Sequence, residues 1–382
     1  MKLSTVFLTL ATAGLVIGCA SQTATNSNST ETAANPGHSA VESPKSADIN
    51  KKISDECKSP IVQMVTKQNG SHQYLLADAT LWQTDDNGSA KLIKKLQDNT
   101  DNYKLIPSDD VIIHYTDDKI MLVHIDSDTD LFRLAGDAKR KNVLFSPNNL
   151  EMATQDSDNV FNIWNVPKRF SGIQITETVQ DFINRQSPDT KMKFSVDAYA
   201  VSLTNEGKAI LATDDAQNNK IGLIYFMDDK NAKGTLKAIG RTNVHIAHLA
   251  ISLSGNNIAA VDETGQLYVS STGEDKGFKI YAKKYNDLIN VKFVGEDVLA
   301  IAKNKITRID IATGNAKWTY ETSPKTCYAP DSQKILCSTG NTIEDINGDT
   351  GTLNRVFFFT STEYGLVEGG ELKGTAPQSC YK

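Results

Sequence analysis

The stretch from Asn142 to Val166 contains three short β-rich runs that are separated by two tight polar turns. Proline fixes φ in the first turn, Ser146-Pro147-Asn148-Asn149, and the second turn runs from Asp156 to Asn159. A unit of three short strands cannot bury both of its apolar faces by itself. The stretch therefore predicts sister units elsewhere in the chain, and this requirement constrains the fold more than any other feature.

Sister units are present along most of the chain. Each has two to four β-rich runs between Gly, Asn, Asp or Ser turns. Repeats of ~35–50 residues with three or four strands fit a β-propeller better than a barrel or a sandwich. We therefore predict an all-β fold, a single β-propeller of about seven four-stranded blades over residues 53–382. The repeat-like segments are Ile61–Leu96, Tyr103–Leu134, Asn142–Thr176, Ala198–Arg241, Ile246–Tyr285, Ile289–Thr322 and Lys325–Phe359.

Two features depart from this regular pattern. Glu177 to Val196 shows no clean alternation and predicts a long excursion between blades, either a recognition loop or a tolerated surface insertion. Closure of a propeller removes its long sheet edges, and one blade can then mix strands from both chain ends. Residues 52–60 and 360–382 are the candidates for such a strand.

Two kinds of repeat can be recognised in these segments. Three turns resemble those of WD40 repeats, although the Trp-Asp signature is missing and only Trp164-Asn165 comes near it. The run from Asp310 to Trp318 resembles the D-x-x-T-G-x-x-x-W turn of quinoprotein-like propeller repeats, with a weaker echo at Asp349-Thr350-Gly351. Such repeats also build the BamB family of lipid-anchored outer-membrane assembly proteins, so the resemblance implies a propeller. The WD40-like turns are Phe145-Ser146-Pro147, Leu203-Thr204-Asn205-Glu206-Gly207 and Leu253-Ser254-Gly255-Asn256.

The N-terminus has the features of a targeting signal. Lys2 supplies a positive start, and Leu3 to Ile17 is an apolar run too short to span a bilayer comfortably. The sequence Val16-Ile17-Gly18-Cys19 resembles the lipobox of bacterial lipoproteins. That resemblance implies a signal peptide at residues 1–18, cleavage after Gly18 and lipidation of Cys19. An ordinary signal peptide with an incidental cysteine is the alternative.

Residues 19–52 are predicted to be the lipidated cysteine and a flexible linker. Ala20 to Lys52 is rich in Ser, Thr, Asn and Ala, with almost no large apolar residue, so it cannot bury enough surface to fold. A chain of about thirty such residues has an r.m.s. span of roughly 30 Å. Because Ala20 rather than an aspartate follows the cysteine, the expected location is the outer membrane, with the body on the periplasmic face or at the cell surface.

The chain has five cysteines, and lipidation of Cys19 would leave four. An even number outside the cytoplasm indicates two disulfides, although three pairings are open. Cys57 and Cys380 flank the folded body, and a bridge between them would fasten the two chain ends. Cys327 and Cys337 would then form the second bridge. Buried thiols or another pairing are the alternatives.

The proposed second bridge conflicts with simple strand alternation. Cys327 and Cys337 lie on either side of the turn Pro330-Asp331-Ser332-Gln333. If the apolar Tyr328 and Ile335 point to the same side, the two cysteines point to opposite faces. Pairing between them therefore requires a bulge.

No group of residues predicts a metal site. His245 and His248 are three positions apart, which places them on opposite faces of a strand, so packing or hydrogen bonding is their expected role. His114 and His124 lie in adjacent predicted strands, but no further ligand completes a site. Residues 345–351 imitate the start of a calcium loop, yet Val356 stands where the bidentate glutamate is needed. A hairpin turn is expected there.

Catalytic motifs are also missing from the sequence. There is no G-x-S-x-G elbow, H-E-x-x-H, C-x-x-C or glycine-rich phosphate loop, so no catalytic, cofactor-binding or metal-binding residue is predicted. Trp82, Trp164 and Trp318 fall in predicted strands, where they pack between blades or mark a partner surface. The short basic runs Lys91–Lys95 and Tyr281–Tyr285 are expected at solvated strand edges.

The net charge of −6 argues against a nucleic-acid partner, because a phosphate backbone requires a basic face. The expected function is that of a non-enzymatic scaffold without a cofactor. It would be held to the membrane by its lipid and would bind envelope proteins. Two alternatives remain open. One is a BamB-like role in outer-membrane protein assembly, and the other is an enzyme or small-molecule binder with a site at the central channel.

Overall fold

All residues that the computed structural model describes lie in one compact unit of the chain, Ser43–Lys382. They are residues 46–67, 69–107, 110–115, 120–127, 130–133, 142–145, 151–155, 161–165, 171–175, 200–203, 209–214, 222–228, 235–242, 244–271, 279–285 and 287–382. The predicted signal peptide, Cys19, most of the linker and the excursion at 177–196 lie outside them. Within these residues no helix is long and apolar enough to cross a bilayer.

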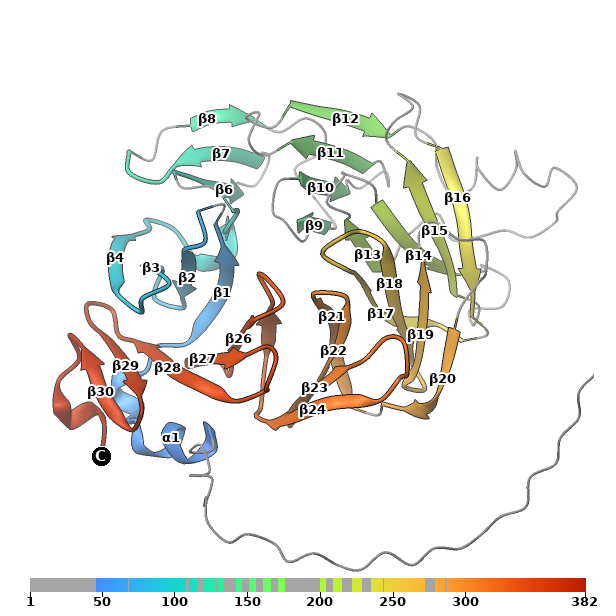
Figure 1. The fold of residues 1–382 in the computed structure, drawn as a ribbon. Helices are drawn as coiled ribbons and strands as arrows, with labels where there is room; N and C mark the ends of the chain where they lie inside the picture. Colours follow the sequence, from blue (N-terminus) through green and yellow to red (C-terminus); the bar gives the residue numbers. More distant parts are fainter. Residues whose placement is uncertain are drawn as a thin grey trace, which may run out of the picture. The chain divides into compact units, whose positions relative to one another are not determined.

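The described strands form seven antiparallel sheets, in which strands adjacent in the chain are paired (Figure 1). Sheet 1 contains β1 (Ile61–Thr66), β2 (His72–Leu76), β3 (Thr80–Thr84) and β4 (Ala90–Lys95); sheet 2 contains β5 (Tyr103–Lys104), β6 (Val111–Tyr115), β7 (Ile120–His124) and β8 (Asp130–Arg133); sheet 3 contains β9 (Asn142–Phe145), β10 (Glu151–Gln155), β11 (Phe161–Asn165) and β12 (Ser171–Ile175). Sheet 4 contains β13 (Ala200–Leu203), β14 (Ala209–Asp214), β15 (Gly222–Asp228) and β16 (Thr235–Arg241); sheet 5 contains β17 (Ile246–Ile251), β18 (Asn257–Asp262), β19 (Gln266–Ser271) and β20 (Lys279–Lys284); sheet 6 contains β21 (Leu288–Val294), β22 (Asp297–Ala302), β23 (Lys305–Ile309) and β24 (Ala316–Glu321). Sheet 7 contains β25 (Thr326–Tyr328), β26 (Lys334–Ser338), β27 (Thr342–Asn347), β28 (Leu353–Phe359), β29 (Tyr364–Glu368) and β30 (Glu371–Gly374).

Each sheet follows one of the seven repeat-like segments, because short apolar runs separated by tight turns pair with their neighbours in the chain. Gly265 illustrates the turn chemistry: its φ of +78° is a left-handed conformation that glycine adopts without a Cβ clash, and it lies between β18 and β19. Figure 1 shows the first strand of a sheet on the inner side and the fourth on the outer side, as in β21 and β24.

Neighbouring sheets pack face to face through apolar side chains. Buried clusters join sheet 1 to sheet 2, sheet 4 to sheet 5, sheet 5 to sheet 6, sheet 6 to sheet 7, and sheet 7 to sheet 1. The first strands of sheets 3 and 4 also contact each other. Because both faces are covered, β2 and β22 are buried at every position and lack the alternation of a half-exposed strand.

The chain enters sheet 1 through helix α1 (Ser46–Lys52) and the 3-10 helix η1 (Asp55–Cys57). Ile49 and Ile53 are four residues apart and are buried with Val356 and Phe358 of sheet 7. The last seven residues of the predicted flexible linker are therefore helical. Ile49 and Ile53 supply the apolar contact that holds this helix against sheet 7.

Sheet 7 has six strands rather than the four expected of each blade. Residues 360–382, one of the two candidates for an additional strand, form β29, β30 and the 3-10 helix η3 (Gln378–Cys380). Residues 52–60 form no strand, and their one β-type pairing is the isolated bridge between Ile53 and Tyr381. A further 3-10 helix, η2 (Thr100–Asn102), precedes β5.

The disulfide between Cys327 and Cys337 needs no bulge, contrary to the sequence argument. The two residues lie directly opposite each other on β25 and β26, and Tyr328 lies opposite Leu336. The assumption that Tyr328 shares a face with Ile335 was wrong. Both faces of β26 are buried between neighbouring sheets, so apolar character does not identify a face.

Candidate functional site

The first strands of sheets 1, 5 and 6 share a β-bulge near their start. The pairing register shifts there, and the extra residues are Val62, Ala247 and Ile289. A bulge leaves the extra residue out of the ladder and redirects its side chain. Val62 is 47% exposed although it is apolar. The bulges therefore leave Val62 and Ala247 exposed, whereas Ile289 packs against the buried cluster between sheets 6 and 7.

The residue after the bulge connects neighbouring first strands. The Gln63 side chain donates through Nε2 to the Tyr103 carbonyl at 2.6 Å, and its Oε1 accepts from the Leu105 N–H at 2.9 Å. At the equivalent position of β17, His248 Nε2 lies 3.3 Å from the Leu288 carbonyl oxygen. Burial lowers the pKa of His248, so the neutral ring donates this hydrogen bond. His248 thus has the hydrogen-bonding role that its spacing predicted, here between sheets 5 and 6.

Two lysines lie on first strands between buried apolar residues. Lys104 on β5 is flanked by residues that are buried between sheets 1 and 2. Lys292 on β21 is flanked by residues that are buried between sheets 5 and 6. Side chains alternate along a strand, so each lysine points away from the cluster that holds its neighbours. Neither was singled out from the sequence, where the available signal was a charge inside an apolar run.

The electrostatics of these two lysines are unusual for surface residues. Lys292 is exposed and Lys104 is partly exposed, yet desolvation lowers the pKa of both ammonium groups. The charge of Lys104 contributes a smaller lowering of the pKa of Lys292. No ion pair or side-chain hydrogen bond is found between either ammonium group and another described residue.

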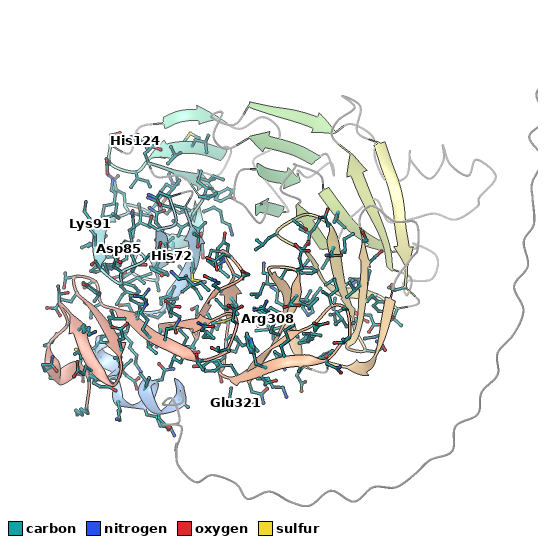
Figure 2. The ribbon with its side chains drawn as sticks, viewed as in Figure 1. His72, Asp85, Lys91, His124, Arg308 and Glu321 are labelled. Carbon is teal, nitrogen blue, oxygen red and sulfur yellow. A yellow bond between two sulfur atoms is a disulfide. The ribbon has the colours of Figure 1, made fainter. Side chains whose placement is uncertain are left out.

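A second polar cluster lies where sheet 1 meets sheet 7. Lys334 Nζ is 2.7 Å from Asp86 Oδ1, and Arg355 Nη2 donates to the Asp86 carbonyl at 2.8 Å. The hydrogen bond from Lys334 lowers the pKa of Asp86. His72, labelled in Figure 2, is buried beside this cluster and shares a 2.8 Å hydrogen bond with Thr66. Burial lowers the pKa of His72 to about 4, so the ring is neutral near pH 7.

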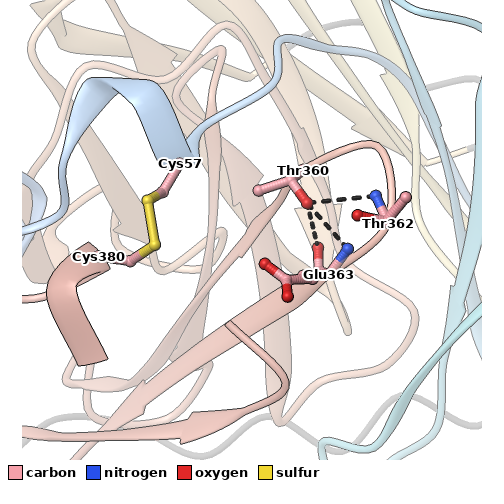
Figure 3. The surroundings of a disulfide bond; sticks show 5 residues. All are labelled: Cys57, Thr360, Thr362, Glu363 and Cys380. Atoms are coloured by element: carbon pink, nitrogen blue, oxygen red, sulfur yellow. Dashed lines mark hydrogen bonds between the residues drawn. A yellow bond between two sulfur atoms is a disulfide. The ribbon is translucent and has the colours of Figure 1, made fainter. Parts of the chain in front are cut away.

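The two ends of the described chain are fastened together by a set of contacts that we call the terminal latch. It consists of the Cys57–Cys380 disulfide, the hydrogen bond from Ser59 N–H to the Phe359 carbonyl at 2.7 Å, and the Ile53–Tyr381 bridge. The Cα atoms of the two cysteines are 5.8 Å apart. Figure 3 shows the disulfide near the turn after β28, which the Thr360 hydroxyl caps. The two disulfides are the pairs that the sequence analysis favoured.

The D-x-x-T-G-x-x-x-W segment forms a turn that reaches the next sheet. Asp310 Oδ1 accepts hydrogen bonds from two backbone N–H groups of the turn, at 2.9 and 2.8 Å. Trp318 Nε1 donates to the Gly348 carbonyl of sheet 7 at 2.8 Å. A Cβ on Gly351 would lie 2.6 Å from the Trp318 ring, so a glycine is required for this approach.

Buried charges also join sheets 6 and 7. Arg308, labelled in Figure 2, donates through Nε to Asp297 Oδ2 at 2.7 Å and through Nη1 to the Gly348 carbonyl at 2.7 Å. Lys317 Nζ lies 2.7 Å from the same Asp297 oxygen. The buried carboxylate thus has two cationic partners, and we assign this network to the packing of the two sheets.

The histidine pair and the calcium-like segment contact other protein groups. His114 and His124 are not cross-strand partners, because His124 lies opposite Val111. Asp345 Oδ2 is 2.8 Å from Arg355 Nε, so this carboxylate forms a salt bridge with an arginine. The described part of the chain contains no group of three or more His, Cys, Asp or Glu side chains that could hold a metal ion.

Trp82 packs between sheets, as one of its two predicted roles requires. Its ring centroid is 5.4 Å from that of Phe359 in sheet 7. Lys91 lies on the outer strand β4 and is labelled in Figure 2, at a strand edge as expected. The side chains of Trp164 and of residues 281–284 lie outside the described part.

No protein-family model and no curated protein sequence matches the chain. Solved structures do resemble it. The computationally designed Ika8 protein has a TM-score of 0.53 at 14% identity, covering 83% of this chain and 96% of that one. Hsv2p of Kluyveromyces lactis, a β-propeller, has a TM-score of 0.51 at 12% identity, covering 78% of this chain and 98% of that one. The fold is that of a β-propeller. At these identities the likeness concerns the fold alone.

Proposed function

We propose that this protein is a lipid-anchored envelope scaffold, a closed propeller of seven blades that holds protein partners and catalyses no reaction. The anchor is Cys19, exposed as the new N-terminus by cleavage after Gly18, and the proposed location is the outer membrane. The supporting sequence feature is the lipobox-like Val16-Ile17-Gly18-Cys19. Two disulfides are consistent with an oxidising compartment.

Packing between sheets 1 and 7 supports closure of the ring. Ile61 N–H donates to the Gly340 carbonyl at 2.6 Å, and Tyr74 and Trp82 pack on Phe359. In a closed ring every sheet is covered on both faces, which requires contacts of this kind between the first and last blades. Closure would leave two broad loop faces on a stiff body, which is the arrangement that protein-binding propellers need.

The terminal latch is the observation on which this proposal mainly depends. It joins the chain segment closest to the lipid, at Cys57, to the last residues of the folded body, at Cys380. A force applied through the anchor would therefore act on the disulfide between the chain ends and would not separate β1 from its sheet. Such a connection suits a body that must stay folded while it is tethered and bound to partners.

The scaffold proposal is tested by affinity purification after crosslinking in intact cells. Full-length tagged protein and a Cys19→Ser variant would be compared. We expect reproducible envelope partners with the native chain, and release of the variant from the membrane fraction without detergent. No reproducible partner, or a native chain that washes off freely, would count against the proposal. Protease treatment of intact cells distinguishes the cell surface from the periplasmic face.

A BamB-like role in outer-membrane protein assembly is the second candidate. The observation in its favour is the turn from Asp310 to Trp318, whose indole bonds the next sheet. A deletion strain tests it, because loss of an assembly factor lowers the amounts of outer-membrane barrel proteins. A normal outer-membrane protein profile in that strain would exclude this role and leave the scaffold proposal intact.

A further inference from the structure

We propose that Asn87 is a site of spontaneous covalent modification, at which the side-chain amide is lost as ammonia and a carboxylate takes its place. The reaction needs neither an enzyme nor a cofactor. It goes beyond the scaffold function and does not depend on the lipid anchor. The evidence is the way in which the side chain of Asn87 differs from those of two other asparagines in similar sequence.

In this reaction the backbone of the chain attacks one of its own side chains. The nitrogen of Gly88 loses its proton and bonds to Cγ of Asn87, the Cγ–Nδ2 bond breaks, and Nδ2 takes up a proton and leaves as ammonia. Water then opens the succinimide ring at either carbonyl and gives aspartate or isoaspartate. No electrons are exchanged, and water is the only co-reactant. A glycine after the asparagine favours ring closure, because it has no Cβ to obstruct the attack.

The chain has three asparagines that precede a glycine, at Asn69, Asn87 and Asn347. Asn347 is held firmly: its Oδ1 accepts hydrogen bonds from two backbone N–H groups of its own turn, at 2.9 and 3.0 Å. The next residue, Gly348, is buried, and its N–H donates to the Gln333 carbonyl at 2.6 Å. Both reacting groups of this pair are therefore engaged, so ring closure is disfavoured there.

Asn69 and Asn87 lie in two turns of sheet 1 that have the same backbone hydrogen bonds. One turn joins β1 to β2, and the other joins β3 to β4. The residue two positions before the asparagine donates its N–H to the carbonyl of the serine two positions after it, at 2.8 Å in the first turn and 3.0 Å in the second. The glycine N–H donates to the carbonyl of the residue three positions before it, at 3.1 and 3.2 Å. The two sites therefore differ in their side chains and not in this backbone pattern.

The side chain is held in the first turn and is left without a partner in the second. Asn69 Oδ1 accepts from the N–H of Ser71 at 3.0 Å and from its hydroxyl at 2.7 Å. In the second turn the equivalent N–H, that of Ser89, donates instead to Oδ1 of Asp85 at 2.9 Å (Figure 2). Asn69 and Asn87 are both exposed, but the Asn87 side chain has no hydrogen bond to any described residue. Asn87 can therefore turn its Cγ toward the next backbone nitrogen, whereas Asn69 must first break two hydrogen bonds.

The product would alter the junction between sheets 1 and 7. Gly88 lies against this junction, because a Cβ on it would be 2.9 Å from side-chain atoms of both Arg355 and Leu366. Isoaspartate carries the chain through the side-chain carbon and so lengthens the backbone just before Gly88. We expect this to displace the turn from sheet 7. Chain aged until Asn87 is converted should have a lower urea midpoint than fresh chain, and an unchanged midpoint would contradict this consequence.

The test follows the three asparagines in the full mature chain in detergent, incubated at mildly alkaline pH. Trypsin cleaves after Lys67 and Lys91, so Asn69 and Asn87 are measured in one peptide by mass spectrometry of its fragment ions. A parallel incubation in urea removes the fold and keeps the sequence. In the folded chain we expect Asn87 to react at least about tenfold faster than Asn69 or Asn347, each of which is held by two hydrogen bonds. In urea the three rates should be similar.

An Asp85→Ala variant tests the cause of this difference. Loss of the carboxylate frees the Ser89 N–H to bind Asn87 Oδ1, as Ser71 binds Asn69, so the Asn87 rate should fall toward the Asn69 rate. Asp78→Ala is the matched control, because it removes the same charge and similar turn hydrogen bonds between β2 and β3. It should leave the Asn87 rate unchanged.

Three results would overturn the proposal or its cause. If Asn87 reacts no faster than Asn69 in the folded chain, Asn87 is not a preferred site. If Asn87 leads by the same factor in urea, the fold has no part in the preference. If the Asn87 rate in Asp85→Ala stays the same or rises, competition for the serine N–H is not the cause. Should that variant unfold, the comparison of the native chain with and without urea still decides the proposal.

Discussion

The terminal latch should contribute more stability than the second disulfide, although both bridges are buried or partly buried. The Cys57–Cys380 bond spans 323 residues, and the Cys327–Cys337 bond spans 10. Loss of loop-closure entropy from the unfolded chain gives about 5.8 kcal/mol for the long loop and about 2.7 kcal/mol for the short one. We therefore expect the Cys57–Cys380 disulfide of the latch to contribute about 3 kcal/mol more to the free energy of unfolding than the Cys327–Cys337 disulfide does.

The measurement compares two double variants, Cys57→Ala with Cys380→Ala, and Cys327→Ala with Cys337→Ala. Each removes two sulfur atoms and adds no polar group, so the pairs are matched chemically. Urea unfolding followed by tryptophan fluorescence is a suitable assay, because Trp82 packs on Phe359 at the junction of the first and last sheets. The reasoning is refuted if both variants lose equal stability, or if the short-loop variant loses more.

Three further predictions concern the junctions between sheets. Gly351→Ala should lower the free energy of unfolding by about 3 kcal/mol, because the φ of Gly351 is +70° and a Cβ would lie 2.6 Å from the Trp318 ring. Gly369→Ala is the control: its φ is +60° with open space around it, so the loss in the same urea assay should be only about 1 kcal/mol. Arg308→Met should lower the free energy of unfolding by about 3 kcal/mol, because it removes one cationic partner of the buried Asp297. Adding Asp297→Leu should restore part of that stability, and a double variant that is no more stable than Arg308→Met would contradict this account. The pKa of His72 in the folded protein is about 4, below its usual 6.5. Its contribution to the free energy of unfolding is therefore fully present above pH 6.5 and is lost as the pH falls toward 4. The loss should reach about 3 kcal/mol and should be smaller in His72→Gln, as urea midpoints at pH 7.5 and 4.5 would show.

Local sequence determined which residues form strands. The turn at Ser254-Gly255-Asn256 separates β17 from β18, which pair with each other, and each predicted repeat-like segment contains strands of only one sheet. Short-range pairing is readable because turn chemistry and β propensity act over a few residues. The same locality explains why residues 360–382 could be named as a candidate for additional strands.

Contacts between sheets were decided only by the tertiary structure. The assumed shared face of Tyr328 and Ile335 was wrong because both faces of these sheets are buried, so apolar alternation carries no information there. The helix at Ser46–Lys52 forms because Ile49 meets sheet 7, some three hundred residues later in the chain. Lys104 and Lys292 looked like isolated charges in apolar runs. What surrounds each ammonium group depends on the packing of strands that are far apart in sequence, and no local pattern encodes those surroundings.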